Sequence, residues 1–264
     1  MVFNTVILVY FSATDVSKKY AKAMGRALDI RAKEFDFTTP SKRDLDNVPS
    51  FAEDDLVILA LPVYGGRVPD ICLDYLSRLK GHNTPCVVVC TYGNREFEDA
   101  LVEMEDIMNS NGFNVVGGAA VVGRHSFSDK IAGNRPTKED LEGAAEFIKL
   151  AVQKENVRLN QGIIPGNRPY KEKMNRVNTM MPKTLDTCIN CKFCAKMCPN
   201  GVISMEDPRT MVKDASACLR CNSCVVRCPV HAKYFDGPEW QKAVEGAIAR
   251  FGKPDKPNKY FICA

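Results

Sequence analysis

Residues 5–11 read TVILVYF, an unbroken apolar run that is rich in β-branched side chains. Such a run is typical of a strand that is buried on both faces of a parallel sheet. A polar loop follows, and apolar residues then recur at helical spacing over residues 17–28. The start of the chain therefore predicts a strand, a loop and a helix in succession.

The same alternation continues along the chain. We expect four further strands, at residues 32–37, 56–61, 86–90 and 114–122. Helices are expected between and after them, at residues 69–79, 97–109 and 138–155, and Pro69 suits a first helical position. Five strands alternating with helices predict an α/β fold with a doubly wound parallel sheet, whose ligands bind beyond the carboxyl ends of the strands.

The composition changes after this first domain, which we expect to span residues 1–155. Residues 156–183 contain glycines and prolines without periodicity and are interpreted as a linker. The linker carries basic residues, namely Arg158, Arg168, Lys171, Lys173, Arg176 and Lys183. A solvated or intramolecular role for them is favoured over docking of an acidic partner. Residues 184–236 form a cysteine-rich domain, and residues 237–264 form a helix (239–251) and an irregular tail.

Eight of the twelve cysteines fall in two copies of one pattern. Residues 188–199 read CINCKFCAKMCP, and residues 218–229 read CLRCNSCVVRCP. Both match the spacing C-x2-C-x2-C-x3-C-P, in which three thiolates bind one iron–sulfur cluster and the fourth reaches the other cluster. The repeat thus predicts two four-iron clusters with crossed ligation.

One cluster is assigned to Cys188, Cys191, Cys194 and Cys228, and the other to Cys198, Cys218, Cys221 and Cys224. Four thiolates close each coordination shell, which favours electron transfer over substrate binding. Paired CxxC motifs also bind zinc, but zinc needs neither the third closely spaced cysteine nor the proline. Residues 184–236 resemble bacterial ferredoxins with two [4Fe-4S] clusters, and the resemblance implies a small α+β domain.

The remaining cysteines and two of the histidines suggest no site. The four cysteines outside the motifs, which are interpreted as packing residues, are Cys72, Cys86, Cys90 and Cys263. His82 and His231 have no sequence neighbours that suggest a metal or a nucleophile. His125, after the fifth strand, is either a structural loop residue or a group that donates a proton or binds substrate.

Three loops should meet at the carboxyl edge of the sheet. They read SATDVS (residues 12–17), PVYGG (62–66) and TYGNREF (91–97). The first offers hydroxyls and helix N-terminal amides to a phosphate, and it resembles the flavodoxin phosphate loop [ST]-x-T-G-x-[ST]. In this chain Asp15 stands where that loop usually has glycine. Asp15 must therefore point outward if a phosphate is to bind, whereas the alternative for Ser17 or Asp15 is a plain helix cap.

The second and third loops look like the flavodoxin loops that hold the flavin ring, with Tyr64 and Phe97 at the positions of the covering aromatics. This resemblance implies an FMN site made of Ser12, Thr14, Asp15, Val16, Ser17, Pro62, Val63, Tyr64, Gly65, Thr91, Tyr92, Gly93, Asn94 and Phe97. FAD and NAD are disfavoured because no G-x-G-x-x-G follows the first strand.

The whole chain resembles flavodoxin–ferredoxin fusion proteins of anaerobic prokaryotes. The resemblance implies the five-strand order 2-1-3-4-5 and an electron-transfer function in which FMN and the clusters exchange electrons. Two alternatives remain: a flavin-dependent reductase of a small acceptor, and a ferredoxin whose flavodoxin-like domain docks a partner without binding flavin.

Charge and hydropathy limit the classes of partner and location that remain. The net charge of +4 divides unevenly, because residues 1–150 hold 17 basic and 22 acidic side chains. Two oxidised clusters would bring roughly two negative charges each and so balance part of the basic excess of the second half, which disfavours nucleic acid as a partner. No run of about 18 apolar residues is present, so we expect no membrane insertion and a cytoplasmic protein. The expected partner is a redox protein or a small electron acceptor.

Overall fold

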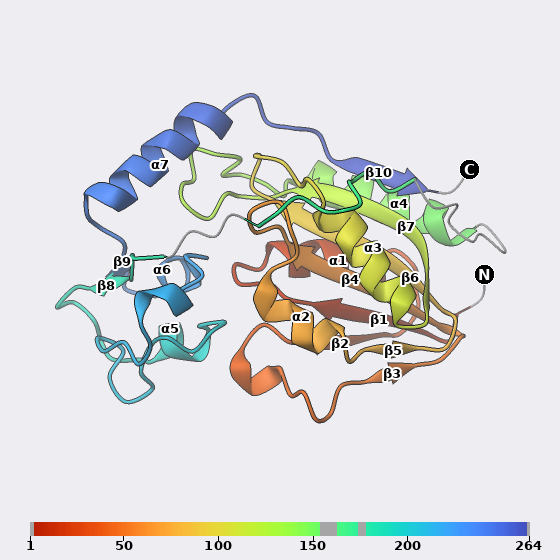
Figure 1. Cartoon of the computed structure of the whole chain (residues 1–264), viewed down its shortest axis with the longest axis horizontal. Helices are drawn as coiled ribbons and strands as arrows, with labels where there is room; N and C mark the ends of the chain where they lie inside the picture. Colours follow the sequence, from red (N-terminus) through yellow and green to blue (C-terminus); the bar gives the residue numbers. More distant parts are fainter. Residues whose placement is uncertain (1–2, 154–162, 174–177, 263–264) are drawn as a thin grey trace.

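The computed structural model describes residues 3–153, 163–173 and 178–262. Its centre is a six-stranded sheet with helices on both faces (Figure 1). The five parallel strands are β1 (Thr5–Tyr10), β2 (Ala32–Asp36), β4 (Asp55–Pro62), β6 (Thr84–Tyr92) and β7 (Phe113–Val122). Four of them are almost wholly buried, as their continuous apolar sequences predict, whereas β2 lies at an edge and is more exposed.

The sheet has the order β10-β7-β6-β4-β1-β2. Without β10, the parallel strands follow the order 2-1-3-4-5 of the doubly wound flavodoxin-like sheet. The α/β fold class is therefore confirmed, with one strand more than the sequence predicts.

Two helices cover each face of the sheet. Helices α1 (Val16–Arg26) and α4 (Lys138–Gln153) pack on one face, where Met24 and Phe147 belong to one buried apolar cluster. Helices α2 (Asp70–Leu76) and α3 (Ala100–Ser110) cover the other face, where Leu76 and Met104 belong to a second cluster. The domain thus has three layers and two apolar cores.

Two helices begin later than the sequence predicts. Pro69 precedes the first residue of α2 and has an extended ψ of 132°, so it is not a helical residue. Helix α3 begins at Ala100 rather than at residue 97, because Glu98 has a positive φ of 45°. A two-stranded ladder of β3 (Ser50–Phe51) and β5 (Lys80–Gly81) lies outside the main sheet.

The C-terminal tail is not irregular throughout, contrary to the prediction. Residues Lys259–Ile262 form β10, which pairs antiparallel with β7 and completes the edge of the sheet. An apolar strand such as β7 would otherwise have unpaired amides and carbonyls along its edge. The tail therefore returns from the cysteine-rich domain to the first domain (Figure 1).

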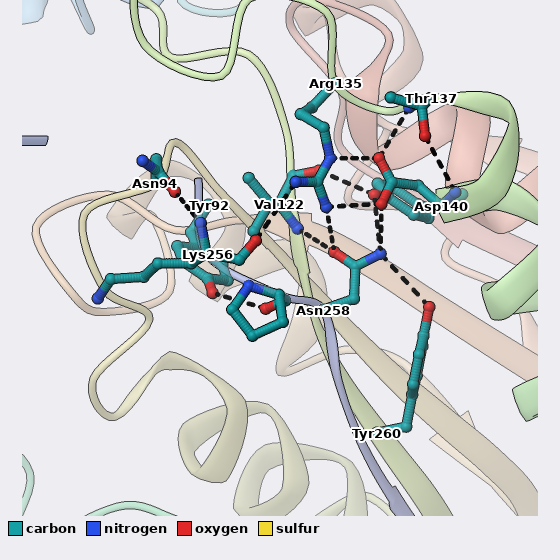
Figure 2. A network of polar contacts seen from close by, with 11 residues as sticks. Tyr92, Asn94, Val122, Arg135, Thr137, Asp140, Lys256, Asn258 and Tyr260 are labelled. Atoms are coloured by element: carbon teal, nitrogen blue, oxygen red, sulfur yellow. Dashed lines mark hydrogen bonds and ion pairs between the residues drawn. The ribbon is translucent and has the colours of Figure 1, made fainter. Parts of the chain in front are cut away.

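A polar network holds the tail in place beside β10 (Figure 2). The Asn258 side-chain oxygen accepts hydrogen bonds from the Val122 amide at 2.8 Å and from Arg135 at 3.2 Å. The Asn258 side-chain nitrogen donates to Asp140 at 3.0 Å, and Arg135 forms a bidentate ion pair with the same carboxylate. One asparagine of the tail therefore joins the end of β7 to the start of α4.

Replacing Asn258 with alanine should lower the free energy of unfolding by about 1–3 kcal/mol, because the Val122 amide and the Asp140 carboxylate lose a partner in a partly buried site. Urea unfolding followed by circular dichroism measures the change. Asp255→Ala, at an exposed position of the same tail, is the matched control and should change the free energy by less than about 0.5 kcal/mol. Equal effects of the two substitutions would show that the network does not stabilise the fold.

The described part of the predicted linker, residues 163–173, lies along α3. Ile164 is buried against the core, where Gly118 leaves room for its side chain. Arg168 forms ion pairs with Glu105 and Asp106. Three further ion pairs also lie within the chain: Lys171 pairs with Glu98, Lys173 with Asp70, and Lys183 with Asp236. Arg158 and Arg176 lie outside the described residues.

The cysteine-rich domain has little regular structure. It contains the two-stranded ladder of β8 (Lys183–Thr184) and β9 (Lys233–Tyr234), and the short helices α5 (Phe193–Lys196) and α6 (Ser223–Val226). Helix α7 (Pro238–Phe251) then leads to the tail. In the described part of the chain no helix is both long and apolar enough to cross a membrane.

Candidate functional site

A pocket lies at the carboxyl edge of the sheet, where the loops after β1, β4, β6 and β7 meet. It has an empty volume of about 560 Å³, counting the part open to solvent. It is lined by Ser12, Ala13, Thr14, Val16, Ser17, Pro62, Val63, Tyr64, Thr91, Tyr92, Gly93, Gly123, Arg124, His125, Ser126 and Cys221. Of the described residues that line this pocket, none is acidic, so an anionic group meets no like charge in the wall.

The loop after β1 presents a helix N-terminus to this pocket. The Lys18 amide donates a hydrogen bond to the Ser12 hydroxyl oxygen at 3.1 Å. The hydroxyls of Ser17 and Thr91 form a hydrogen bond at 2.8 Å. Thr14 lines the pocket, and its hydroxyl has no hydrogen-bond partner among the described residues. The first amides of α1 have no helical partner, which is the usual basis of phosphate binding at such ends.

Asp15 adopts the left-handed conformation, with φ 64° and ψ 2°, that glycine favours at this position. Its carboxylate does not line the pocket. It points to the cysteine-rich domain, where Arg227 approaches Asp15 Oδ1 at 2.8 Å. The residue that departs from the flavodoxin loop therefore uses the backbone conformation of glycine and directs its charge away from the pocket.

Four residues of the predicted FMN set lie outside the pocket wall, namely Asp15, Gly65, Asn94 and Phe97. The Phe97 ring is buried and packs against Tyr92, with ring centroids 5.7 Å apart, rather than covering the pocket. The Asn94 side chain donates to the carbonyls of Phe251 and Pro254 and so anchors the C-terminal segment. Both side chains are thus engaged in packing the tail.

The pocket includes residues that the predicted set lacks. Gly123, Arg124, His125 and Ser126 come from the loop after β7, and the position of this loop after the fifth strand is the signal that points to them. Ala13 lies within the first loop. Cys221 belongs to the other domain, and no local pattern places it beside the pocket.

His125 is a neutral side chain of the pocket. Burial disfavours the charged imidazolium and lowers the pKa of His125 to about 4. The ring Nδ1 accepts a hydrogen bond from the Phe127 amide at 3.1 Å, so the proton of the neutral ring resides on Nε2. His125 therefore brings a hydrogen-bond donor, and no charge, to the pocket.

Acid should destabilise the fold through His125. The unfolded chain takes up the proton near pH 6.5 and the folded chain only near pH 4. The contribution of neutral His125 to the free energy of unfolding is therefore fully present above pH 6.5 and is lost as the pH drops toward 4. At pH 5 this lowers the free energy of unfolding by about 2 kcal/mol, and His125→Gln should remove this decrease. Urea unfolding at pH 7.5 and 5 measures the difference, with His82→Gln as the exposed control. The same acid loss in His125→Gln would contradict the assignment.

The second cysteine motif and the end of the first enclose a common cavity. Cys198, Cys218, Cys221 and Cys224 all line it, although Cys198 belongs to the first motif. The Val202 amide donates to Cys198 Sγ at 3.4 Å. This set of four is called the inner cysteine group.

Three of the other motif cysteines, Cys188, Cys194 and Cys228, lie near one another. Burial raises the pKa of the Cys194 thiol, and the nearby thiols of Cys188 and Cys228 raise it further. The Ala232 amide donates to Cys228 Sγ at 3.1 Å. Cys191, which belongs to the first motif with Cys188 and Cys194, is exposed. Cys188, Cys191, Cys194 and Cys228 are called the outer cysteine group.

Lys233 lies near cysteines of both groups. It is 2% exposed, and its Nζ donates to Thr184 Oγ1 at 2.7 Å and to the Pro208 carbonyl at 2.5 Å. Its charge is close enough to lower the pKa values of Cys194 and Cys224, which belong to different groups, against the larger effect of burial. A buried cation between two sets of thiolates balances the negative charge that iron–sulfur ligation brings.

The cysteines outside the two groups are packing residues where they are described. Cys72, Cys86 and Cys90 are buried in the first domain, and burial raises their thiol pKa values. Cys263 lies outside the described residues. His82 bonds the Ser50 hydroxyl at the surface.

One protein family matches part of the chain. Residues 187–232 match the family described as "4Fe-4S dicluster domain". A comparison with curated proteins gave no match.

Solved structures similar to the chain include a flavodoxin from the domain Archaea, with 15% identity, a TM-score of 0.41 and coverage of 56% of this chain and 96% of that one. Oxidised Flavodoxin 2 from Bacillus cereus has 15% identity and a TM-score of 0.41, with coverage of 57% and 99%. An azoreductase from Bacillus anthracis str. Sterne has 14% identity and a TM-score of 0.39, with coverage of 56% and 99%.

The cysteine spacing, the matched family and the cavity lined by four cysteines all identify a [4Fe-4S] iron–sulfur domain. The first domain has the strand order of a flavodoxin-like sheet and a pocket at the edge where such sheets bind ligands. The chain therefore joins a domain with a flavodoxin-like sheet to a [4Fe-4S] iron–sulfur domain.

Proposed function

We propose that this protein is an electron-transfer iron–sulfur flavoprotein, in which FMN in the pocket of the first domain exchanges electrons with two [4Fe-4S] clusters. The observation that carries the proposal is the shared wall of the two sites. Cys221 lines both the pocket and the cavity of the inner cysteine group. A redox group in the pocket would thus lie against a cluster ligand.

The pocket residues fit FMN. The amides at the start of α1 and the Thr14 hydroxyl would hold the phosphate, and the ring of Tyr64 or Tyr92 would pack on the flavin. Arg124 and the neutral His125 would add donors at the wall. A bound FMN supplies the conversion between two-electron and one-electron transfer.

The outward direction of Asp15 supports this proposal over a flavin-free docking module. The notable departure from the flavodoxin phosphate loop is an acidic residue, and its charge is paired with Arg227 outside the pocket. A phosphate at the start of α1 would therefore meet the helix amides without an opposing carboxylate from this loop in the wall.

Chemical analysis of protein purified without oxygen tests the proposal. We expect about eight irons, about eight sulfides and one FMN per chain. A chain with iron that binds no FMN after reconstitution would contradict the flavin site and favour the docking module. Anaerobic reoxidation of the flavin by a small acceptor, lost in Tyr92→Ala with flavin retained, would instead identify a reductase.

A further inference from the structure

The second cysteine motif holds the rim of the pocket on two sides. On one side, Arg227 donates from Nε to the Ala13 carbonyl at 3.1 Å and pairs with Asp15 at 2.8 Å. On the other side, the Asn222 side-chain amide donates to the Ser126 carbonyl. Ala13 and Ser126 both line the pocket. Short segments of one motif thus contact the loops after β1 and β7 at once.

Cys221 directly precedes Asn222 in sequence and lines the same pocket as Ala13 and Ser126. It packs with Leu219 against the larger apolar cluster of the first domain, and it is close enough to Tyr64 to raise the pKa of that hydroxyl, together with the larger effect of burial. The Arg220 guanidinium stands over the Phe127 ring at 5.9 Å, beside Ser126. The loop that carries Cys221 is therefore held on the pocket from several directions.

No cysteine of the outer group lines the pocket of the first domain. Cys191 is exposed, and its neighbours Ile189 and Phe193 are 62% and 40% exposed, which is unusual for large apolar side chains. None of the residues 188–194 lines the pocket of the first domain. The two groups thus differ at one cysteine each: Cys221 of the inner group lies in the pocket wall, whereas Cys191 of the outer group is exposed.

We propose that Arg227 and Asn222 form an interdomain latch that fixes Cys221 in the pocket wall. The cluster of the inner cysteine group then exchanges electrons with the pocket, and the cluster of the outer group exchanges electrons with external partners. The order of the two clusters in electron transfer rests on the proposed function. The latch itself rests on the contacts alone. Asp15 is then a docking residue, which accounts for an acidic side chain at a position where a phosphate loop usually has glycine.

The electron steps balance in this order. A reduced flavin bound in the pocket would give one electron to the inner [4Fe-4S] cluster, and transfer of that electron to the outer cluster would reoxidise the inner one. A second electron follows the same route, and the protons released by the flavin pass to solvent or to a base in the pocket. An external one-electron acceptor that docks near Cys191 would receive each electron in turn.

Substitutions in the latch test the proposal on the holoprotein. Asp15→Asn removes the charge and keeps a residue that tolerates the left-handed conformation, and Arg227→Gln removes the other charge. Hydrogen–deuterium exchange at residues 12–17 and 123–127 should become about fivefold faster in both variants, which corresponds to about 1 kcal/mol. The double variant should exchange no faster than the single variants, because the two residues act as one pair.

A second measurement addresses the position of Cys221. At saturating FMN, with iron and flavin contents unchanged, both variants should lose the fast phase of cluster reduction by photoreduced flavin. Arg227→Lys keeps the charge and should recover part of that phase. Lys196→Gln, which removes a cation near the outer group, is the matched control and should leave exchange and transfer unchanged.

The possible outcomes separate the proposals. Unchanged exchange and an unchanged fast phase in both variants, with both cofactors present, would overturn the latch and leave the proposed function standing. A lower FMN affinity in Arg227→Gln with unchanged exchange would also overturn it, because Arg227 would then act on the phosphate. Absence of bound flavin would overturn the proposed function, while the exchange experiment would still decide on the latch.

Discussion

Replacing Cys198 with alanine should remove about half of the bound iron and leave about four irons per chain, because the inner group loses one of its four thiolates. Cys228→Ala should have the same effect through the outer group. Both losses follow from the crossed ligation that we propose. Iron and sulfide analysis, with visible absorbance, measures them.

Pairs of substitutions distinguish crossed from uncrossed ligation. If Cys198 and Cys221 bind the same cluster, the double variant should retain as much iron as Cys198→Ala alone. Cys198→Ala combined with Cys191→Ala should lose nearly all iron, since each cluster is then damaged. The opposite pattern would mean that each motif binds its own cluster. Cys86→Ala, in the core of the first domain, is the control that should keep all of the iron.

Replacing Thr14 with alanine should weaken FMN binding by about 10- to 100-fold. Its hydroxyl lines the pocket beside the start of α1, and a hydrogen bond to a charged phosphate contributes about 1.5–3 kcal/mol. Fluorescence titration of flavin-depleted protein measures the affinity. Ser41→Ala, at an exposed position after β2, should leave it unchanged.

Riboflavin provides a matched ligand for this prediction because it has no phosphate. Thr14→Ala should change riboflavin affinity by less than about threefold if the hydroxyl contacts only the phosphate. Equal losses for FMN and riboflavin would place Thr14 at the ring or attribute the effect to a changed loop. Loss of FMN affinity alone would support the phosphate site at the start of α1.

The sequence predicts most of the first domain because its signals are local. The continuous apolar runs of β1, β4, β6 and β7 define buried parallel strands, and helical spacing defines the intervening helices. Errors occur where a backbone conformation overrides the pattern. The positive φ of Glu98 delays the start of α3.

The tail shows a different kind of error. Residues 259–262 read KYFI, which is too short a run to identify a strand from its own pattern. Its pairing with β7 depends on the open edge of a sheet that lies more than 130 positions earlier, and on Asn258, which bonds the end of that strand. No local pattern contains this information, because strand pairing is set by long-range contact.

The amino-acid sequence by itself determined the iron–sulfur domain and the parallel sheet, since cysteine spacing and hydrophobic period are properties of adjacent residues. Only the tertiary structure decided where the two sites lie relative to each other. The carboxylate of Asp15 points outward because it pairs with Arg227, which is distant in sequence, and Cys221 of the same motif lies in the pocket wall. These features depend on how the domains pack, and packing joins residues that no short pattern relates.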